Sequence, residues 1–334
     1  MTAIVRPAEP HDLDRLEAMI ARVDAGMLTM PSSRDAMAER IRRSAAAFAR
    51  ESAPPQNECY FLVMEEDGEL LGTASLFTNL GVERPFYSYR ISRDSKMSPE
   101  LKLQVELDLL HLVNDYHGAT ELGTLFIERK ARGGGRGRLL SFARLLLIAA
   151  DPLRFGSRAM AEIRGWTDAG GESPFWSAVG QKFFRLDYKV ADQLSARDHR
   201  FIADLMPRYP IYADLLPEDA RKVIGQSHPE AAPALAMLRS QGFHFNQVVD
   251  IFDAGPSVEA FVDQIDVVRS AQYMSGAEFV AHASLDVGLV AAAQFDRFAA
   301  TQFDGADDRS TALKRIGVSD AEGVLVYTRN EKRR

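Results

Sequence analysis

Cysteine is almost absent from this 334-residue sequence: Cys59 is the single one, so the chain cannot form a disulfide within itself. The first residues, MTAIVRPAEPHDLDRL, lack the basic stretch followed by an apolar stretch that marks an export signal. No CxxC pair, HExxH motif or cluster among the seven histidines indicates a metal site. We therefore expect a cytoplasmic protein with no bound metal.

Long apolar runs and an excess of positive charge are also missing. The longest apolar stretch, residues 139–150, is interrupted by Arg144 and is shorter than the about 20 residues that a membrane-spanning helix needs. Forty Lys and Arg residues against 47 Asp and Glu residues give a net charge of −7, which disfavours a nucleic-acid partner. The 46% of hydrophobic residues is typical of a soluble globular protein. We expect neither a membrane nor a nucleic acid among its partners.

Strand and helix patterns alternate along the chain. Asp67-Gly68 separates two apolar segments and predicts a β-hairpin, because both residues tolerate a positive φ. Ser173 and Pro174 are typical of a helix start, and Gly242 of a helix end. Apolar periodicity predicts further strands at residues 3–6, 86–91, 101–109, 120–128 and 159–164, and helices near residues 13–20, 33–50 and from about 137. This order favours a mixed α/β sheet.

The strongest local signal is a glycine-rich turn between a predicted strand and a predicted helix. Its residues are Arg132, Gly133, Gly134, Gly135, Arg136, Gly137 and Arg138. Glycines allow a ligand to approach the backbone closely, and the free N–H groups at a helix start attract anions. The turn is thus a candidate pyrophosphate site.

Three other interpretations of this turn are weaker or simpler. A nucleotide-binding Walker loop needs Lys followed by Ser or Thr, where this chain has Arg138-Leu139. A dinucleotide-binding turn would lie in the first βαβ unit, whereas this turn follows several strands. A solvated surface turn or an RNA-contacting Arg-Gly segment stays open on the turn alone.

The turn resembles the R/Q-x-x-G-x-G/A loop of acyl-CoA acetyltransferases, through Arg132, Gly135 and Gly137. Several longer segments together resemble one family, the arginine N-succinyltransferases. They cover most of residues 1–265: PFYSYR, ELGTLFI, RGGGRGRLLSFAR, AEIRG, SPFWSAVGQKFF, FIADLMPRYPIY, VIGQSHPEAAPALAMLRSQGF and DIFDAGP.

The resemblance implies transfer of a succinyl group from succinyl-CoA to the α-amine of L-arginine, in arginine catabolism. It also implies a GNAT-like acyl-CoA N-acyltransferase fold, in which a mixed sheet is flanked by helices. Within that fold we predict an acyltransferase domain at residues 1–190, a second GNAT-like half at 191–265, and a small β-rich segment at 266–334. The second half is suggested by the helix–Gly242–strand unit, which echoes residues 177–188.

The resemblance also implies roles for individual residues. Leu125 is expected at the succinyl-CoA contact, and His228 as the proton donor to the departing CoA thiolate. Succinyl-CoA is a co-substrate, and no permanently bound cofactor is expected.

Residue chemistry adds further candidates. Glu121 and Glu162 could accept the amine proton or pair with the guanidinium of arginine, but structural salt bridges explain them equally well. Arg90, with Tyr87 and Tyr89, could hold a carboxylate of a substrate. The resemblance to related acyltransferases, which have a tyrosine after the last helix, implies Tyr188 as a second candidate for the proton donor.

Alternatives to this assignment stay open. The family usually has other residues where this chain has Asp115-Tyr116-His117-Gly118, Met27-Leu28-Thr29-Met30-Pro31 and Gln241-Gly242-Phe243. The acceptor could therefore be ornithine or another basic amino acid, or the chain could be a non-catalytic subunit of a hetero-oligomer. We expect a homo- or hetero-oligomer. We also expect direct transfer in a ternary complex, because Cys59 has no neighbouring His or Asp signature that would activate it as a nucleophile.

Overall fold

The computed structural model describes residues 3–20, 31, 33–195 and 200–328, and a sheet of 14 strands runs through these residues. The strand order is β11-β14-β12-β13-β1-β2-β3-β6-β7-β10-β9-β4-β5-β8. All described neighbours pair antiparallel except β6 and β7, which are parallel. The strands are β1 Ile4–Pro7, β2 Cys59–Glu66, β3 Glu69–Phe77, β4 Ser88–Ser98, β5 Leu103–Val113, β6 Thr120–Ile127, β7 Arg158–Glu162, β8 Ile211–Tyr212, β9 His244–Val249, β10 Pro256–Phe261, β11 Gln272–Ser275, β12 Val287–Ala292, β13 Ala300–Asp304 and β14 Gly323–Thr328.

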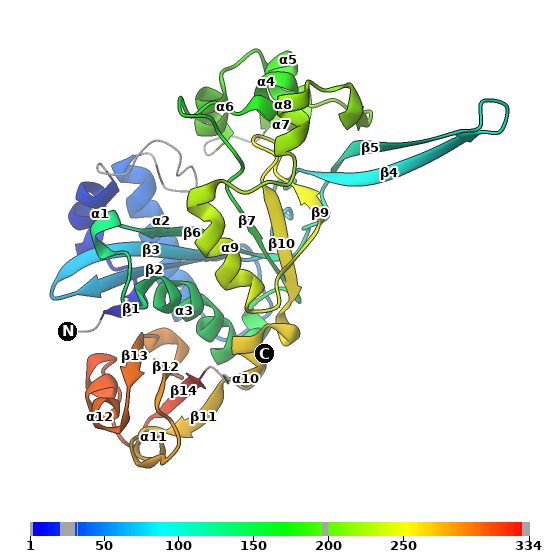
Figure 1. Ribbon diagram of the computed structural model, residues 1–334. Coiled ribbons are helices and arrows are strands. Elements are labelled where there is room, and N and C mark those ends of the chain that lie inside the picture. The colour runs from blue at the N-terminus through cyan, green and yellow to red at the C-terminus, as the bar shows by residue number, and fades with distance from the viewer. Residues whose placement is uncertain (1–2, 21–30, 32, 196–199, 329–334) are drawn as a thin grey trace.

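Helices cover both faces of this sheet (Figure 1). Strand β2 shows the division, because its alternate residues enter different cores: Phe61 and Val63 pack with helices α1 and α2, whereas Tyr60 and Leu62 pack with α3. The helices are α1 Leu13–Ile20, α2 Arg34–Ala49, α3 Arg136–Ala150, α4 Pro174–Ala178, α5 Gly180–Phe184, α6 Tyr188–Ser195, α7 Arg200–Leu205, α8 Glu218–Val223, α9 Ala232–Arg239, α10 Asp266–Ser270, α11 Gly276–Ala281 and α12 Ala306–Arg315. No helix of the described residues is both long and apolar enough to span a membrane.

Local signals placed several elements correctly. Asp67 and Gly68 have φ angles of 52° and 78° and join β2 to β3, as predicted. The Ser33 hydroxyl accepts the N–H of Ala36 at the start of α2, and the Ser173 hydroxyl accepts the N–H of Trp176 at the start of α4. These predictions held because each depends on a few neighbouring residues.

The C-terminal segment joins the main sheet through strand β13. This strand pairs with β1 at Ile4–Thr301 and Val5–Ala300, and the Thr301 hydroxyl donates to the Ala3 carbonyl oxygen at 2.9 Å. Besides four strands the segment contains helices α10, α11 and α12. The division at residues 190 and 265 stays a prediction, since one sheet passes through all three parts.

The two segments of the suggested internal repeat, residues 177–188 and the unit around Gly242, have different structures. After Gly242 the chain enters strand β9, but after α5 it enters helix α6. Trp176 explains the difference, because its ring stacks on Phe184 and Phe252 and its Nε1 donates to the Leu186 carbonyl, which holds residues 174–188 as a helical cluster.

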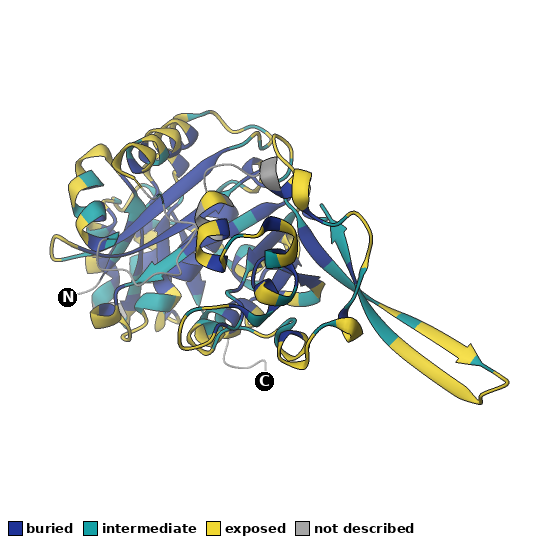
Figure 2. Cartoon of the chain, turned by 90° about the horizontal axis from the view of Figure 1, so that it is seen from above, coloured by how far each residue is buried: buried dark blue, intermediate teal, exposed yellow. Residues whose placement is uncertain are grey.

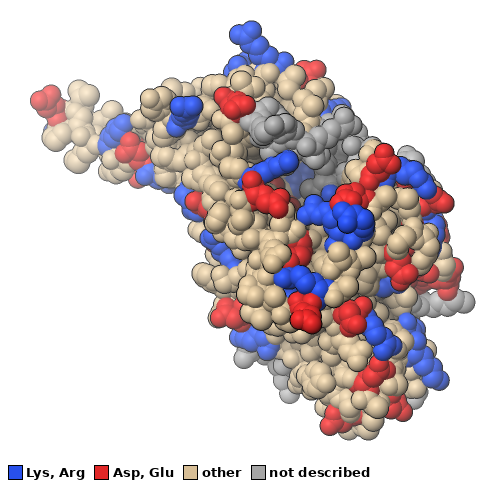
Figure 3. Space-filling model, turned by 180° about the vertical axis from the view of Figure 1, so that it is seen from behind, with Lys and Arg blue, Asp and Glu red and all other residues tan. Residues whose placement is uncertain are grey.

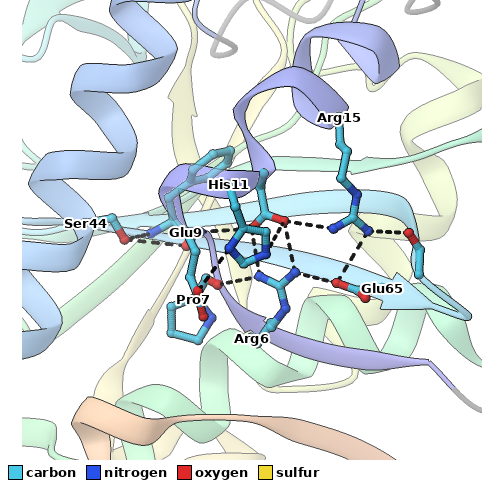
Figure 4. Close-up of polar contacts among 10 residues, drawn as sticks. Arg6, Pro7, Glu9, His11, Arg15, Ser44 and Glu65 are labelled. Atoms are coloured by element: carbon cyan, nitrogen blue, oxygen red, sulfur yellow. Dashed lines mark hydrogen bonds and ion pairs between the residues drawn. The ribbon is translucent and has the colours of Figure 1, made fainter.

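A polar network ties the N-terminal strand to the β2–β3 hairpin (Figure 4). Asp12 is fully buried and receives the guanidinium groups of Arg6 at 2.7 Å and Arg15 at 3.1 Å, while Arg6 also pairs with Glu65. Burial opposes ionisation of Asp12, but the hydrogen bonds and charge of its partners, Arg6 foremost, outweigh it and lower the pKa of this carboxyl. The network therefore holds a buried carboxylate in its charged form.

Strands β4 and β5 form an arm that leaves the body of the molecule (Figure 1). They pair from Ser88–Val113 at the body to Ser98–Leu103 at the tip. The arm is buried at its base and exposed toward the tip (Figure 2). The predicted strand at residues 101–109 is confirmed from Leu103 onward, but its exposed leucines do not enter a core within this chain.

Candidate active site

The glycine-rich turn lies after β6 and opens helix α3, as the sequence predicts. Gly133, Gly134 and Gly135 have φ angles of 111°, 58° and 79°, which only glycine adopts readily. An added Cβ at Gly135 would lie 2.7 Å from Oε1 of Gln302 on β13. The end of the flexible Gln302 side chain can move aside, so the main obstacle to a side chain at Gly135 is its positive φ.

The helix start leaves hydrogen-bond donors available. Leu139 makes the first helical hydrogen bond, to the Gly135 carbonyl, and the N–H of Arg136 donates to Gly133. Among the described residues the N–H groups of Gly137 and Arg138 have no backbone acceptor in the preceding turn. Such N–H groups at the positive end of a helix are suited to bind an anion.

The three arginines of the turn differ in their surroundings. Arg136 is engaged by Glu66 at the end of β2, at 2.6 Å. Arg132 is exposed, and Arg138 lines a cavity of about 580 Å³ between α3, the end of α9 and β14. Of the three predicted anion contacts, Arg132 and Arg138 are therefore the ones whose charge is open to a ligand.

The parallel strands β6 and β7 separate soon after they meet. They pair only at Thr120–Ala159 and Glu121–Met160. Beyond that point β6 stays with β3, with a register shift near Thr124, which has a φ of 52°. Leu125 is half-buried in the separated part of β6 and packs against the core that contains α3. The sheet thus opens beside the glycine-rich turn.

His228 lies at this opening, next to the segment that follows β7. Its N–H donates to the Arg164 carbonyl at 2.8 Å, and Ser227 bridges to Gly165. Its φ and ψ of −58° and 140° are extended, as Pro229 requires. The segment is therefore fixed to the end of β7 by backbone hydrogen bonds.

The ring of His228 is oriented by its own backbone. Nδ1 accepts the N–H of Glu230 at 3.2 Å, so in the neutral ring Nε2 carries the proton. Partial burial and the charge of Arg164 lower the pKa of His228. At neutral pH the ring is thus mainly a neutral Nε2–H donor.

Glu230 connects the ends of both separated strands to the His228 segment. Its carboxylate lies 3.9 Å from Arg129, which follows β6, and 3.9 Å from Arg164, which follows β7. All three side chains are solvent-accessible, so each pair is weak. No motif or spacing in the sequence singles out these three residues.

Asp253 is a buried anchor beneath this segment that the sequence analysis also missed. Its carboxylate accepts the N–H groups of Gly165 at 2.7 Å and Gly255 at 2.8 Å, and the Tyr188 hydroxyl lies at 3.5 Å. A Cβ on Gly165 would lie 2.6 Å from the carboxyl carbon of Asp253. The DIFDAGP motif contains Asp253, but its partners are distant in sequence, so spacing could not reveal them.

Asp250 is half-buried beside Asp253. Burial and the neighbouring carboxylate raise the pKa of Asp250 to about 8. Burial raises the pKa of Asp253 as well, and each carboxylate accepts two backbone N–H groups. Both of the bonds to Asp250 reach its Oδ1 and leave its Oδ2 for a proton, whereas Asp253 uses both oxygens and lies near Arg164, so we assign the proton of the pair to Asp250. Asp253 is then the ionised member.

Tyr188 begins helix α6 and is 6% exposed, within the aromatic cluster around Trp176. Its hydroxyl approaches Asp253, beneath the His228 segment. The structure therefore gives Tyr188 a buried position, which does not favour the role of second proton donor.

Glu121 and Glu162 lie where β6 and β7 separate, on the sheet face opposite α3. Leu122 and Ala161 enter the core of α3, so the alternate positions 121 and 162 point to the other face. Burial raises the pKa of Glu121 to about 7, although Arg40 and Arg144 oppose this shift. Glu121 therefore already has two arginine neighbours.

The predicted carboxylate-binding group is only partly accessible. The Arg90 Nε donates to Asp115 at 2.6 Å and a terminal nitrogen donates to the Asn246 carbonyl at 3.2 Å. Tyr87 is half-buried, whereas Tyr89 is fully buried against Phe175. The structure places Tyr89 in the aromatic core instead of at a surface that a substrate could reach.

Two predicted features have no structural outcome. The segment Met27–Pro31 differs from the residues usual in the family, and residues 27–30 of it lie outside the described residues. Among the described residues no group of three or more His, Cys, Asp or Glu side chains could hold a metal ion.

Comparison with known proteins gives one consistent family. A family model described as arginine N-succinyltransferase beta subunit matches residues 3–267. The arginine N-succinyltransferase subunit beta of Pseudomonas aeruginosa is 38% identical over 270 residues, which cover 80% of this chain and 79% of that protein. The arginine N-succinyltransferase of an Enterobacter species is 36% identical over 301 residues, or 89% and 87% of the two chains.

A solved structure agrees over nearly the whole chain. The arginine/ornithine succinyltransferase subunit AI from Pseudomonas aeruginosa superposes with a TM-score of 0.85 and 30% identity, covering 98% of both chains. The predicted mixed sheet flanked by helices is confirmed. The C-terminal segment, which the family-like motifs of residues 1–265 do not reach, belongs to the shared fold.

Proposed function

This chain belongs to the arginine N-succinyltransferase family, and we propose that it transfers the succinyl group of succinyl-CoA to the α-amine of L-arginine, a reaction of arginine catabolism. The observation that carries this proposal is the position of the glycine-rich turn and His228 on either side of the opening between β6 and β7.

Succinyl-CoA enters the proposal as a co-substrate. Its pyrophosphate would accept hydrogen bonds from the N–H groups of Gly137 and Arg138 at the start of α3, with the Arg132 and Arg138 side chains adding charge. Gly133, Gly134 and Gly135 would allow the close approach. The backbone of β6 beyond Glu121, no longer paired with β7, offers polar groups to the amides of the pantetheine arm, next to Leu125.

The transfer itself needs no covalent enzyme intermediate. The neutral α-amine attacks the thioester carbon, a C–N bond forms, the C–S bond breaks, and the amine loses a proton while the sulfur gains one. His228 is the proposed proton donor. A neutral imidazole is too weak an acid to protonate a thiolate, so the ring would first take up the proton that the amine loses and would then give a proton from Nε2 to the departing sulfur. Before that transfer its Nε2–H would stabilise the developing thiolate by a hydrogen bond. Cys59, the only cysteine, is buried and its pKa is raised to about 11, which does not suit a nucleophile.

The two glutamates have different proposed tasks. Glu121, with a pKa near neutrality, is suited to accept the amine proton through water. A substrate guanidinium beside Glu121 would meet the charges of Arg40 and Arg144, so Glu162 is the better guanidinium partner. Arg90 and Tyr87 would hold a carboxylate, in which case Arg90 would share its charge with Asp115.

Ornithine is the second candidate acceptor. The similar solved structure is titled an arginine/ornithine succinyltransferase subunit, and ornithine carries the same α-amino and carboxyl groups with a shorter cationic chain. We place the reaction in the cytoplasm, in keeping with the single cysteine.

A substrate screen tests the proposal. The purified chain should release free CoA from succinyl-CoA when L-arginine is added, and turnover with arginine, ornithine and lysine should rank the acceptors. Replacement of succinyl-CoA by acetyl-CoA is the acyl control. Absence of CoA release with all three amino acids would contradict a catalytic role and would favour a non-catalytic subunit.

A further inference from the structure

The β4–β5 arm exposes large apolar side chains that this chain does not cover. Met97 is 73% exposed, Leu101 74% and Leu103 51%. Leu103, Val105 and Leu107 lie on one face of β5, because alternate residues of a strand share a face. From behind, most of the arm surface is uncharged, with isolated acidic and basic side chains (Figure 3). Exposed apolar surface of this kind indicates a partner.

One edge of this arm is also open. On the side away from β4, β5 meets β8 only at Leu109 and Leu110, and the Asp108 N–H donates to the Asp214 carboxylate at 2.9 Å. On this side, residues Leu103–Leu107 therefore have no strand beside them within the described residues. Because the N–H of Asp108 points to this edge, those of Gln104 and Glu106 point the same way.

The other edge of the arm, on β4, has no comparable apolar row. Pairing with β9 ends at Arg90, and residues 92–96 beyond it are all polar or charged. Two of their side chains reach across the arm: Arg93 pairs with Asp108 at 2.9 Å, and the Lys96 Nζ lies 5.6 Å from the centre of the Tyr212 ring. The apolar residues Leu103, Val105 and Leu107 instead follow the open edge of β5. The free segment is thus apolar on one face and has outward N–H groups at alternate residues.

We infer that the β5 edge pairs with the β5 edge of a second copy of this chain, in an antiparallel ladder centred on Val105. In this two-fold symmetric register, every residue from Leu103 to Leu107 lies opposite a residue of the same segment in the other copy. Val105 meets Val105, and Leu103 of each copy meets Leu107 of the other, so the apolar residues share one face. Gln104 meets Glu106. Lys102, in the turn before β5, would approach Asp108 and Asp214, of which Asp108 already pairs with Arg93.

The boundaries of the open segment match this register. At one end the chain turns after Lys102, and at the other end β8 begins at the level of Leu109. A second β5 strand therefore fits between the tip and β8. Tyr209 and Leu215, 86% and 83% exposed, flank β8 and extend the apolar surface toward the body.

Single cysteines test the register directly. Opposed odd-numbered residues would be non-hydrogen-bonded pairs with Cα atoms about 4.5 Å apart, which allows a disulfide. Val105→Cys should form a covalent dimer on mild oxidation. Leu103→Cys and Leu107→Cys should each stay monomeric in a denaturing gel, but an equal mixture of the two should give a cross-linked dimer. The native Cys59 is buried and should not react.

Proline variants test whether the edge backbone makes the contact. Glu106→Pro removes an outward N–H and keeps the β4–β5 pairing, so the chain should become monomeric in light scattering coupled to size-exclusion chromatography. Ser95→Pro is the matched control, because Ser95 faces Glu106 and its N–H points to the β4 edge; this variant should stay dimeric.

Three results would overturn the inference. They are a monomeric parent chain at tens of micromolar, a dimer that Glu106→Pro leaves intact, or cross-linking of Leu103→Cys with itself at the yield of Val105→Cys. The inference does not depend on the proposed reaction, since these measurements need no substrate.

Discussion

Strands β6 and β7 and strands β4 and β5 form two pairs with opposite properties. β6 and β7 are parallel, lie among buried residues, and separate after Glu121–Met160. β4 and β5 are antiparallel, stay paired to the tip and leave apolar side chains there in solvent. The comparison shows that a paired backbone does not require a core and that a core does not require complete pairing. The proposed reaction uses the first arrangement and the inferred dimer contact the second.

The largest expected effect is at the opening between β6 and β7. His228→Ala should lower kcat by about 10²- to 10⁴-fold, the usual contribution of general acid catalysis, with little change in either KM. His228→Gln should recover part of this loss, because its amide can donate from nearly the position of Nε2. Steady-state kinetics and the pH profile of kcat measure both variants. Full turnover of His228→Ala with an unaltered profile would exclude His228 as the donor.

Substitution of Asp253 tests whether activity requires the segment after β7 to be held by hydrogen bonds to this carboxylate. Each carboxylate oxygen of Asp253 accepts one backbone N–H group, and Asp253→Asn replaces one of these oxygens by an NH₂ group that cannot accept. We therefore expect a loss of about 1–3 kcal/mol in the free energy of unfolding. The kcat should fall while the pH profile keeps its shape, since Asp253 positions the His228 segment. Asp250→Asn is the control: an amide mimics the protonated carboxyl and should change both quantities less. Equal losses in the two variants would contradict the assigned proton.

The arginines of the glycine-rich turn should affect co-substrate binding alone. Each charge-assisted hydrogen bond to phosphate contributes about 1.5–3 kcal/mol, so the double variant Arg132→Ala, Arg138→Ala should raise the KM for succinyl-CoA at least about tenfold. Arg136→Ala should leave that KM nearly unchanged, because Arg136 pairs with Glu66. Calorimetric titration with CoA checks both, and equal affinities for the double variant and the parent would contradict the site.

Glu121 should make stability depend on pH near the strand opening. Its pKa is about 7 in the folded chain against 4.5 for an ordinary glutamate, so its stabilising contribution is complete below about pH 4.5 and is lost as the pH rises through 7. Glu121→Gln removes this titration and should flatten the curve of unfolding free energy between pH 5 and pH 8, by up to about 2 kcal/mol. Parallel curves for variant and parent would contradict the raised pKa.

The smallest effect should be at the arm tip. Leu101→Ser exchanges a side chain that is 74% exposed, so the free energy of unfolding should change by less than about 0.5 kcal/mol. Leu122→Ser, in the buried core beside the strand opening, should cost several times more. Denaturation at submicromolar concentration, where an arm contact contributes least, gives the comparison. A large loss at Leu101 would show that the arm packs on its own chain.

Local and family signals in the sequence were sufficient for many elements. The Asp67-Gly68 hairpin, the helix near residues 33–50, the Ser173 cap and the strand–turn–helix unit around residues 132–138 depend on short-range geometry, and the structure has each of them. The family followed from ordered motifs along residues 1–265. These conclusions needed no knowledge of which distant segments meet.

Partner choice between distant segments could not be predicted in this way. Arg136 was grouped with the anion-binding arginines, but its partner Glu66 is 70 residues away. Tyr89 was grouped with substrate contacts, but packing against Phe175 buries it. Asp253 was not predicted as a site residue, because its role depends on contacts with Gly165 and Tyr188, which are distant in sequence.

The sequence by itself determined the family, the mixed α/β class and the glycine-rich turn, because these depend on motifs and on periodicities of a few residues. Tertiary structure decided which side chains of the turn stay open, where β6 and β7 separate, and that an alternating row of apolar residues on β5 remains in solvent. The physical reason is that ion pairs, burial and strand neighbours depend on which segments meet, and those segments are up to hundreds of residues apart, as in the pairing of β1 with β13.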